Sequence, residues 1–254
     1  MKREERDLMK ELAAALPDVP RWVEVRSLLL AGHGELFGPD GEGFALCDPD
    51  DELVIVVRKP DHTLIRQALA RTGGMGSVLA TPEDADHAAR VLPDHRRVRA
   101  VIHQLGAGTE RLLEPVDGVR LLEPAELEGL RDLPPELASW LRLAADRRYL
   151  TAAAFAGDRP VSFCCVAALT ETLWDVAIDT LPEYRRRGHA VRCSSYMIRH
   201  MLERDRWPVW GAEEDNRASL ALAARLGFVP EDELVVFRSG GRYPPAGETS
   251  PAKI

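Results

Sequence analysis

The sequence lacks several features that would each define a class of protein. No apolar run approaches the roughly 20 residues that a membrane-spanning helix needs. The seven histidines are scattered without metal-ligand spacing, and the four cysteines form no CxxC pair and no zinc pattern. We therefore predict no metal site, and reduced, buried thiols at Cys47, Cys164, Cys165 and Cys193.

Basic residues are also fewer than acidic ones. The 254 residues contain 33 Lys and Arg against 41 Asp and Glu, a net charge of −8. This balance argues against a general nucleic-acid binder and mildly favours amine-bearing partners. The start, MKREERDLMKELAAAL, is charged and amphipathic and has no apolar signal segment. We therefore expect a cytoplasmic protein, a monomer or homodimer, with no membrane partner.

The first 110 residues have the pattern of an α/β domain. Apolar spacing predicts helices over 3–16, 21–30, 62–71 and 81–92, and β-branched runs predict strands over 53–58, 78–80 and 98–104. The glycine-rich stretch GHGELFG follows a helical segment and lacks dinucleotide spacing, so we predict a loop there, and TGGMGS lacks the Walker lysine and is predicted to be a turn. Residues 106–118 are the expected linker.

The second half has a clearer order of elements. A short strand at 119–122 precedes two helical segments, and a hairpin with turn residues 157–160 follows. The remaining elements are a strand over 173–179, a helix over 188–204, a strand over 209–212, a helix over 217–226 and a strand over 234–238. The tail, 239–254, is expected to be mobile.

Three consecutive arginines stand between a strand and a helix, in DTLPEYRRRGHA. A helix N-terminus offers unpaired N–H groups and partial positive charge, so it is a ready anion site. Gly188 at the helix start allows a phosphate to approach the backbone without a Cβ in the way. The arginines add full charges that suit phosphate. The pattern predicts a pyrophosphate site, with a solvated basic turn as the alternative.

Arg185-x-x-Gly188-x-Ala190 resembles the [Q/R]-x-x-G-x-[G/A] loop of the GNAT superfamily of N-acetyltransferases, which grips the pyrophosphate of acetyl-CoA. Further along, WGAEEDNRASLALAARLGF is similar to the family's strand, N-x-x-S and a helix that ends in L-G-F. The pairing of these motifs also resembles the branch of zwittermicin-resistance-type acetyltransferases, in which a divergent N-terminal half precedes the transferase half.

The resemblance implies an α/β (α+β) fold. A GNAT domain over 119–238, with a mixed, mainly antiparallel central sheet flanked by helices, would follow a smaller α/β domain over 1–110 that is itself a possible degenerate GNAT-like unit. It also implies acetyl-CoA as cosubstrate. The residues carried over to cosubstrate binding are Ile178, Asp179, Thr180, Arg185, Arg186, Arg187, Gly188, His189, Ala190 and Asn216.

The implied reaction is direct attack of an amine on the thioester. An alkyl amine with a pKa of about 10.4 is mostly protonated at neutral pH, so a base matters, whereas a thiol with a pKa of about 8.5 leaves more easily. Candidate bases are Glu213 and Glu214, of which only one can point inward along a strand, and Asp175. Many family members carry a tyrosine acid where this chain has Ala223, so Ser219 is the candidate acid, with helix capping or packing as its alternative role.

These observations favour an acetyl-CoA-dependent N-acetyltransferase that acts on a small-molecule amine. Acetylation of a protein or peptide amine is the alternative within the same class. A CoA-binding pseudoenzyme or sensor is the alternative outside it, because Ala223 replaces the tyrosine. Nucleic-acid binding through the arginines is a weaker alternative, which predicts salt-sensitive DNA affinity.

Overall fold

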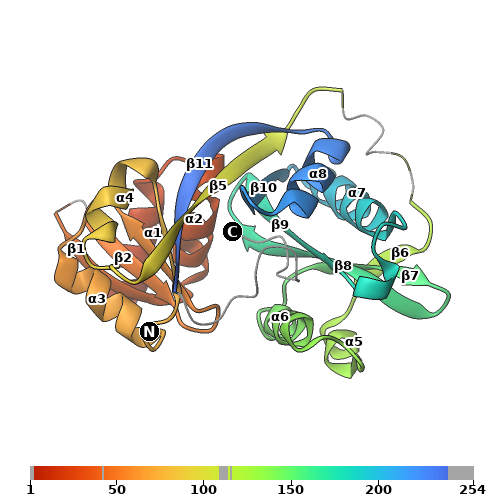
Figure 1. Ribbon diagram of the computed structural model, residues 1–254, viewed down its shortest axis with the longest axis horizontal. Coiled ribbons are helices and arrows are strands. Elements are labelled where there is room, and N and C mark those ends of the chain that lie inside the picture. The colour runs from red at the N-terminus through yellow and green to blue at the C-terminus, as the bar shows by residue number, and fades with distance from the viewer. Residues whose placement is uncertain (1–2, 42, 109–113, 115, 240–254) are drawn as a thin grey trace.

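The computed structural model describes residues 3–239 except 42, 109–113 and 115 (Figure 1). The linker expected at 106–118 therefore lies partly outside the described residues, and the tail expected at 239–254 lies outside them except for Ser239. Within the described part of the chain, no helix is long and apolar enough to cross a membrane. Strands of both halves join into one mixed sheet with helices on its faces.

In the N-terminal half, the structure confirms the helices and strands that the apolar spacing predicts. In chain order it consists of α1 (Arg3–Ala14), the 3-10 helix η1 (Pro20–Trp22), α2 (Val23–Ala31), β1 (Glu35–Asp40), β2 (Gly43–Asp48), β3 (Leu53–Val57), α3 (His62–Arg71), β4 (Ser77–Ala80), α4 (Pro82–Ala89) and β5 (His95–Leu105).

The prediction of a loop over GHGELFG is wrong, because β1 begins inside it. Glu35 pairs with Cys47 at one end of an antiparallel ladder with β2. Gly34, just before the strand, allows the backbone of β1 to approach that of β2 closely. It has φ +85°, and a Cβ there would lie 2.5 Å from the carbonyl oxygen of Cys47. A glycine that allows two strands to approach closely has the same sequence signal as a glycine in a loop, so the sequence pattern does not distinguish them.

The C-terminal half follows the predicted order of elements. It consists of β6 (Val119–Leu122), α5 (Pro124–Gly129), α6 (Pro135–Asp146), β7 (Thr151–Ala156), β8 (Arg159–Leu169), β9 (Leu173–Thr180), the 3-10 helix η3 (Pro182–Tyr184), α7 (His189–Leu202), β10 (Trp207–Glu213), α8 (Arg217–Leu226) and β11 (Phe228–Ser239). The last strand is longer than predicted, because it pairs with β5 from Phe228↔Leu105 to Ser239↔His95.

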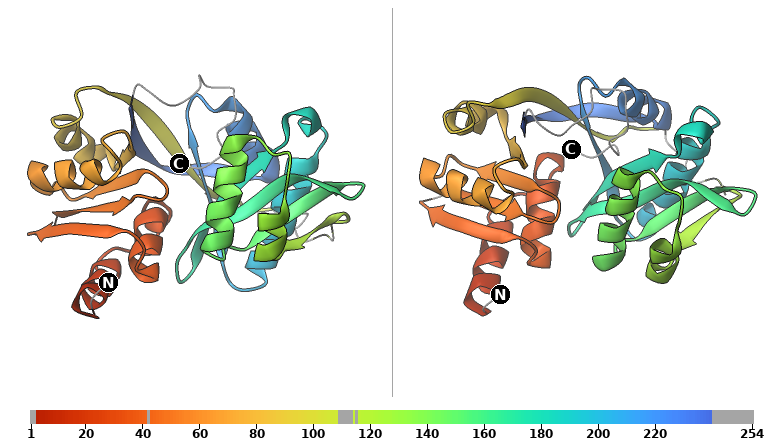
Figure 2. Two further views of the ribbon diagram at one scale, coloured as in Figure 1. Left: turned by 90° about the horizontal axis from the view of Figure 1, so that it is seen from below. Right: turned by 60° about the horizontal axis from the view of Figure 1, so that its bottom comes forward.

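The two halves exchange strands at the centre of the sheet, whose order is β1-β2-β3-β4-β11-β5-β10-β9-β8-β7-β6. β5, from the first half, lies between β10 and β11 of the second, and β11 lies between β4 and β5 (Figures 1 and 2). Of the described strand pairs, β3–β4 and β9–β10 are parallel and the others antiparallel. The mixed, mainly antiparallel sheet that the sequence predicts is therefore confirmed.

The strand order also repeats itself around the β11–β5 pair. If the edge strand β6 is set aside, the two ends of the sheet can be compared strand by strand. Counted inward, β1, β2, β3 and β4 then correspond to β7, β8, β9 and β10. In both halves the parallel pair is joined by a helix, α3 or α7, and another helix, α4 or α8, leads to the exchanged strand. The two halves thus share one arrangement that their residue identities do not reveal.

Helices cover both faces of each half of the sheet. In the C-terminal half, α7 and α8 pack on one face, where Trp210 and Met197 are buried, and α5 and α6 pack on the other, where Phe163 and Leu141 are buried. In the N-terminal half, α1 and α2 cover one face and α3 and α4 the other. The helix α2 also reaches Ala168 of β8 and Val209 of β10. It therefore belongs to the core of both halves.

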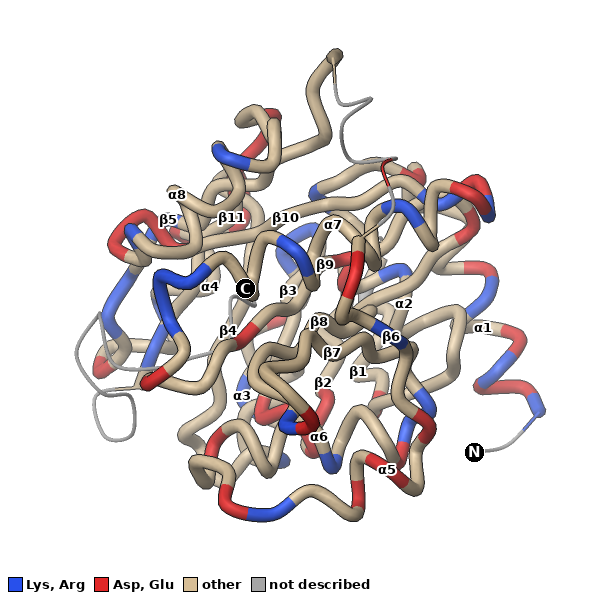
Figure 3. The backbone as a smooth tube through the Cα atoms, turned by 90° about the vertical axis from the view of Figure 1, so that its right-hand side faces the viewer, with Lys and Arg blue, Asp and Glu red and all other residues tan. Residues whose placement is uncertain are grey.

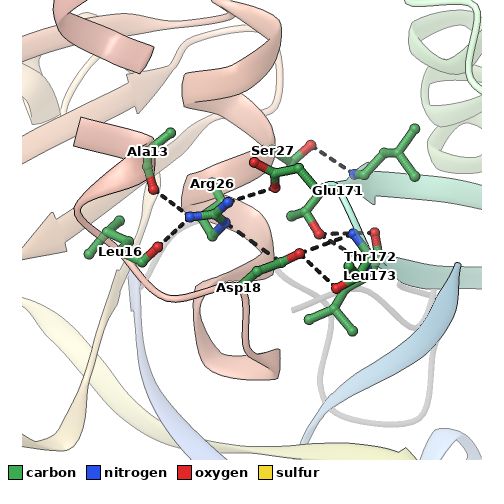
Figure 4. A network of polar contacts seen from close by, with 10 residues as sticks. Ala13, Leu16, Asp18, Arg26, Ser27, Glu171, Thr172 and Leu173 are labelled. Carbon is green, nitrogen blue, oxygen red and sulfur yellow. Dashed lines mark hydrogen bonds and ion pairs between the residues drawn. The ribbon is translucent and has the colours of Figure 1, made fainter. Parts of the chain in front are cut away.

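A polar network fixes α2 to the turn between β8 and β9 (Figure 4). The guanidinium of Arg26 is 5% exposed and donates to the carbonyl oxygens of Ala13 and Leu16 and, at 2.6 Å, to Glu171. The carboxylate of Asp18 accepts from the backbone N–H of Thr172 at 3.0 Å and from its hydroxyl at 2.7 Å. The first half therefore holds the start of β9 in place.

Candidate active site

The parallel strands β9 and β10 separate to form a fork. They pair at Leu173↔Trp207 and Trp174↔Pro208, and Asp175↔Val209 is the last registered pair among the described residues. Beyond it, β9 stays with β8 as far as Thr180, and β10 stays with β5 as far as Glu213. Backbone groups on the inner edges of the fork are then available to pair with an extended ligand.

The helix α7 begins beside the fork with an open N-terminus. Gly188 is its N-cap, with φ +82°, and no atom lies within 4 Å of the Cβ that another residue would carry. The first bond of the helix runs from the N–H of Arg192 to the carbonyl oxygen of Gly188 at 3.1 Å. The preceding N–H groups therefore point out of the helix end, where they can bind an anion.

Arg185 faces inward and ties the loop to the end of β9. Its Nε donates to the carbonyl oxygen of Thr180 at 3.0 Å, and its Nη2 lies 3.4 Å from the carboxylate of Asp179. That carboxylate also accepts the N–H of Thr180 at 2.7 Å. Burial raises the pKa of Asp179, while the Thr180 N–H and Arg185 act to lower it. This arginine therefore positions the loop.

The other two arginines lie differently. Arg186 has a left-handed φ of +61°, which turns the chain before Gly188. The guanidinium of Arg187 lies 5.4 Å from the centre of the Tyr184 ring, at a cation–π distance. Both side chains are exposed, so they can reach a phosphate at the end of α7.

His189 begins α7 and is 9% exposed. Its ring stands edge-on to Tyr184, with 6.1 Å between the ring centres. Its Nδ1 is buried and makes no hydrogen bond with any residue that the structure describes. Burial lowers the pKa of His189, and the charges of Arg192 and Arg187 lower it further. Burial and the two arginines therefore favour the neutral form of the ring.

The two other residues predicted on β9 have buried side chains. Ile178 is 5% exposed and packs in the core beneath α7. The Thr180 hydroxyl shares a hydrogen bond of 2.7 Å with the hydroxyl of Ser162. Both residues thus present their backbone, rather than their side chains, to the fork. Ala190 lies within the first turn of α7 and is half-buried.

Asn216 and Ser219 meet at the start of α8. The Asn216 side chain accepts the N–H of Ser219 at 3.1 Å and so caps the helix. The Ser219 hydroxyl is buried and accepts the indole N–H of Trp210 at 2.9 Å. It keeps its own proton to donate. Ala223, one turn later, is fully buried.

The structure places the predicted bases in three different surroundings. Glu213 accepts from the guanidinium of Arg238 on β11, with Nε at 2.8 Å, so its carboxylate is already engaged. Glu214 is exposed, just past the end of β10. Asp175 stands at the fork and is 1% exposed, on the sheet face that α2 covers through the neighbouring residues Ala168 and Val209. Of the three, only Asp175 lies at the point where β9 and β10 separate.

The corresponding position in the N-terminal half has no fork and no open helix end. β3 and β4 stay paired from Leu53↔Ser77 to Val56↔Ala80, almost to the end of β3. The carboxylate of Asp61 caps α3 and accepts the N–H of Thr63 at 2.7 Å. Hydrogen bonds from Thr63 lower the pKa of Asp61, so a negative charge already occupies this helix end.

From the sequence we expect the first half to form part of the acceptor wall or an interface, but no signal indicates that one of its strands pairs beside the fork. β5 pairs with β10 from Val209↔Gln104 to Glu213↔Ala100 and so holds one arm of the fork. The ion pair between Glu213 and Arg238 spans β5 as well. Neither relation has a signal in the sequence, because each joins residues that are far apart in the chain.

Comparison with known proteins agrees with this geometry. Residues 150–237 match the family model for GNAT acetyltransferases. The uncharacterized N-acetyltransferase YdfB of Bacillus subtilis (strain 168) is 34% identical over 84 residues, which are 33% of this chain and 32% of that protein. The match thus spans about a third of the length of this curated relative.

Solved structures share the fold over most of the chain. A GCN5-related N-acetyltransferase-like protein from Streptococcus suis 89/1591 aligns with a TM-score of 0.66 and 16% identity, covering 92% of this chain and 98% of that one. An acetyltransferase from the GNAT family of Colwellia psychrerythraea aligns with a TM-score of 0.57 and 13% identity, covering 94% and 97%. At these identities the likeness concerns the fold. Residues 150–237 are thus similar to the GNAT acetyltransferases in sequence, and the chain as a whole resembles solved structures of that family in fold.

Proposed function

We propose that the protein is an acetyl-CoA-dependent N-acetyltransferase that transfers acetyl directly to the amine of a small molecule. The observation that carries the proposal is the combination of the fork after Asp175↔Val209 with the uncapped start of α7 at Gly188. An extended thioester arm can pair with the fork while its pyrophosphate is held at the helix end. The corresponding place in the first half, at the start of α3, has neither feature.

The residues present fit such a cosubstrate. The backbone of Ile178, Asp179 and Thr180 would pair with the pantetheine arm, and the N–H groups from Arg186 to Ala190 would receive the phosphates. The side chains of Arg186 and Arg187 add positive charge there. Asn216, the N-cap of α8 just after the end of β10, would use its side-chain amide hydrogens to bind the arm.

The proposed reaction needs no covalent enzyme intermediate. The nitrogen of the neutral amine attacks the thioester carbonyl carbon, the C–N bond forms, and the C–S bond breaks. The amine proton passes to a base, and the departing sulfur takes a proton from an acid or from water. The protein's task is to hold the two reactants in line and to keep the amine neutral.

Catalytic roles are proposed from position. Asp175 is our preferred base because it stands at the fork on the face opposite α7. Glu213 and Glu214 remain candidates, although Glu213 must share its carboxylate with Arg238. Ser219 remains the candidate acid, since its hydroxyl accepts from Trp210 and still carries a proton. A thiol with a pKa of about 8.5 leaves readily, so the acid contributes less than the base.

The N-terminal half, which we predict to be a degenerate unit of the same kind, takes a different part in this proposal. Its own helix end is filled by Asp61, and its strands β3 and β4 do not separate. It contributes β5 to the arm of the fork and α2 to the face beyond it. We propose that it serves as scaffold and acceptor wall. Acetylation of a protein amine and a pseudoenzyme role, motivated by Ala223, are the competing functions.

Thermal unfolding with and without acetyl-CoA tests the proposal. A ligand that binds only the folded chain at 100 times its Kd adds about 2.7 kcal/mol, so we expect the Tm to rise by roughly 5–10 °C. In Gly188→Trp the bulky ring fills the open helix end, and the rise should vanish. Gly74→Trp is the matched control, because Gly74 has a similar φ of +77° and equally open surroundings.

The outcomes separate the alternatives. No rise in the wild type at saturating acetyl-CoA would reject the transferase and return the arginines to a solvated turn. A rise that Gly188→Trp abolishes and Gly74→Trp preserves places the cosubstrate at α7. Thiol release with a panel of amines then separates an enzyme from a pseudoenzyme, and small amines from peptides.

A further inference from the structure

The cleft between the two halves contains a pocket of about 610 Å³, a size that suits a small ligand. One wall is the outward face of α6, which presents Arg142 and Asp146 one helical turn apart. The opposite wall belongs to the first half and includes the turn at His33 and the exposed Asp50. Neither half forms this pocket alone.

A buried ion pair joins the two walls. Arg147, just after α6, donates to both carboxylate oxygens of Asp48 on β2, at 2.7 and 2.6 Å. The two side chains are 9% and 2% exposed. Burial opposes the charge of Arg147, but the hydrogen bonds that it donates to Asp48 and Tyr149 outweigh this effect and raise its pKa. A pair of this kind fixes position more than it adds stability, so the pocket has a set width.

The charged groups that line the pocket carry both signs. Figure 3 shows basic and acidic residues along the chain in the region of α6. Glu35 is paired with Arg71 at 2.5 Å, and Arg147 is paired both with Asp48 and, at 3.3 Å, with Asp50. Arg142 and Asp146 make no ion pair with any described residue, and both are exposed to the cleft. The pocket therefore offers the guanidinium of Arg142 beside the carboxylate of Asp146. This arrangement matches a ligand that has an anionic and a cationic group.

The elements that form the pocket also pack on the sheet at the fork. The inner side of α6 packs against Ala177 of β9. Asp175 lies two residues before Ala177 and so faces the same side of the sheet. The helix α2, which ends at the pocket turn, packs against the residues that flank Asp175. The pocket thus lies on the same side of the sheet as Asp175, opposite α7, and its lining comes from α6 and the first half rather than from β9 or β10.

We propose that this pocket binds the acceptor, and that the acceptor is a small amine that also carries a carboxylate. Arg142 receives the carboxylate, Asp146 attracts the protonated amine as it enters, and the nitrogen gives up its proton before it attacks at the fork. The assignment rests on the proposed N-acetyltransferase function, and it adds the chemical class of the substrate. It also gives the first half a role in specificity, through the wall that faces α6.

Steady-state thiol release from acetyl-CoA tests this assignment with defined probes. The probes are the L-amino acids, their C-terminal amides and the corresponding decarboxylated amines. We expect wild-type kcat/KM to be highest for carboxylate-bearing amines. Arg142→Ala should raise their KM roughly tenfold or more while kcat changes less than about twofold, because a charged hydrogen bond is lost away from the reacting atoms. The amides and decarboxylated amines should be unaffected by this change.

Two matched controls keep the result specific. The control for Arg142→Ala is Arg66→Ala, which removes an exposed arginine from α3. Asp146→Asn neutralises the exposed acid in the pocket, and its control is Glu136→Gln, which neutralises an exposed acid at the other end of α6. Neither control should change KM. Acetyl-CoA binding, measured by calorimetry, should stay the same in all four variants.

Each outcome decides the question. Unchanged KM in Arg142→Ala, a preference for amines without a carboxylate, or neither turnover nor thermal stabilisation with any carboxylate-bearing probe would overturn the pocket assignment. If acetyl-CoA still binds wild type and not Gly188→Trp, the proposed cosubstrate site survives such a result. Loss of acetyl-CoA binding in the wild type would instead reject the proposed function itself.

Discussion

Trp210 donates its indole N–H to the hydroxyl of Ser219 at 2.9 Å, across the buried interface between β10 and α8. Trp210 is fully buried and Ser219 is 5% exposed. The bond joins the arm of the fork to the helix that Asn216 caps. It gives Ser219 a structural role whether or not its proton takes part in catalysis.

Ser219→Ala separates these two roles. The change leaves the indole N–H unsatisfied in the core, so we expect a loss of about 1–3 kcal/mol in the free energy of unfolding, measured by urea denaturation. If Ser219 is the acid, kcat should also fall by about tenfold at pH 7 and recover above pH 8.5, where the thiolate leaves unaided. Trp210→Phe is the control, since it loses stability but keeps the hydroxyl. Equal kcat in the two variants would contradict the acid role.

Arg185 and Arg186 should respond differently to removal. Arg185→Ala breaks the contacts with Thr180 and Asp179, so both the Tm and the affinity for acetyl-CoA should fall. Arg186→Ala removes only an exposed charge near the phosphates, so affinity should fall without a change in Tm, and the loss should shrink at high salt. Calorimetry at two ionic strengths and thermal melting measure these effects. The same response in both variants would argue against the positioning role of Arg185.

His189 should make stability depend on pH. Because its pKa in the folded chain is lowered from 6.5, the unfolded chain takes up a proton first as the pH falls. Its contribution is thus fully present above pH 6.5 and is lost as the pH falls through the lowered value. We expect the free energy of unfolding to decrease more between pH 7 and 5 in the wild type than in His189→Gln, measured by urea denaturation at each pH. Parallel curves for the two proteins would show that His189 is not held neutral.

The transferase segment should not fold without the first half. A fragment of residues 114–254 lacks β5, which pairs with β10 over Val209–Glu213 and with β11 along its whole length. Both strands would then have unpaired edges, which promote aggregation. We expect the fragment to be insoluble or to lack near-ultraviolet circular dichroism, and co-expression with residues 1–113 to restore a folded complex. A soluble fragment that binds acetyl-CoA would show that the exchange of strands is dispensable.

The chain should bind one acetyl-CoA, although its two halves share one arrangement. Asp61 caps α3 where a second pyrophosphate would lie, and β3 and β4 leave no fork. Calorimetry should give a stoichiometry close to one, which Gly188→Trp reduces to zero. Asp61→Gly should not create a second site, because the strands beside it stay paired. A stoichiometry near two would require a site that the register of β3 and β4 does not allow.

The sequence alone determined the local elements and the loop that we propose for the cosubstrate. Apolar spacing along α6 and α7 and the alternation along β8 and β9 mark these elements, because the burial of each residue depends on neighbours within a few positions. Gly188 and the arginines identify the helix start for a similar reason, since the anion site is built from consecutive residues. The glycines around β1 misled the same reasoning, because their close contact is with another strand.

Only the tertiary structure decided which strands meet and what surrounds each carboxylate. The exchange of β5 and β11, the partner that Glu213 finds in Arg238, and the place of Asp175 at the fork all join residues far apart in the chain. Two halves with unlike residues can adopt one arrangement, since a fold requires a pattern of buried positions rather than particular side chains. The tertiary structure also decided the pocket between the halves, because its walls come together only when α2, β2 and α6 have packed.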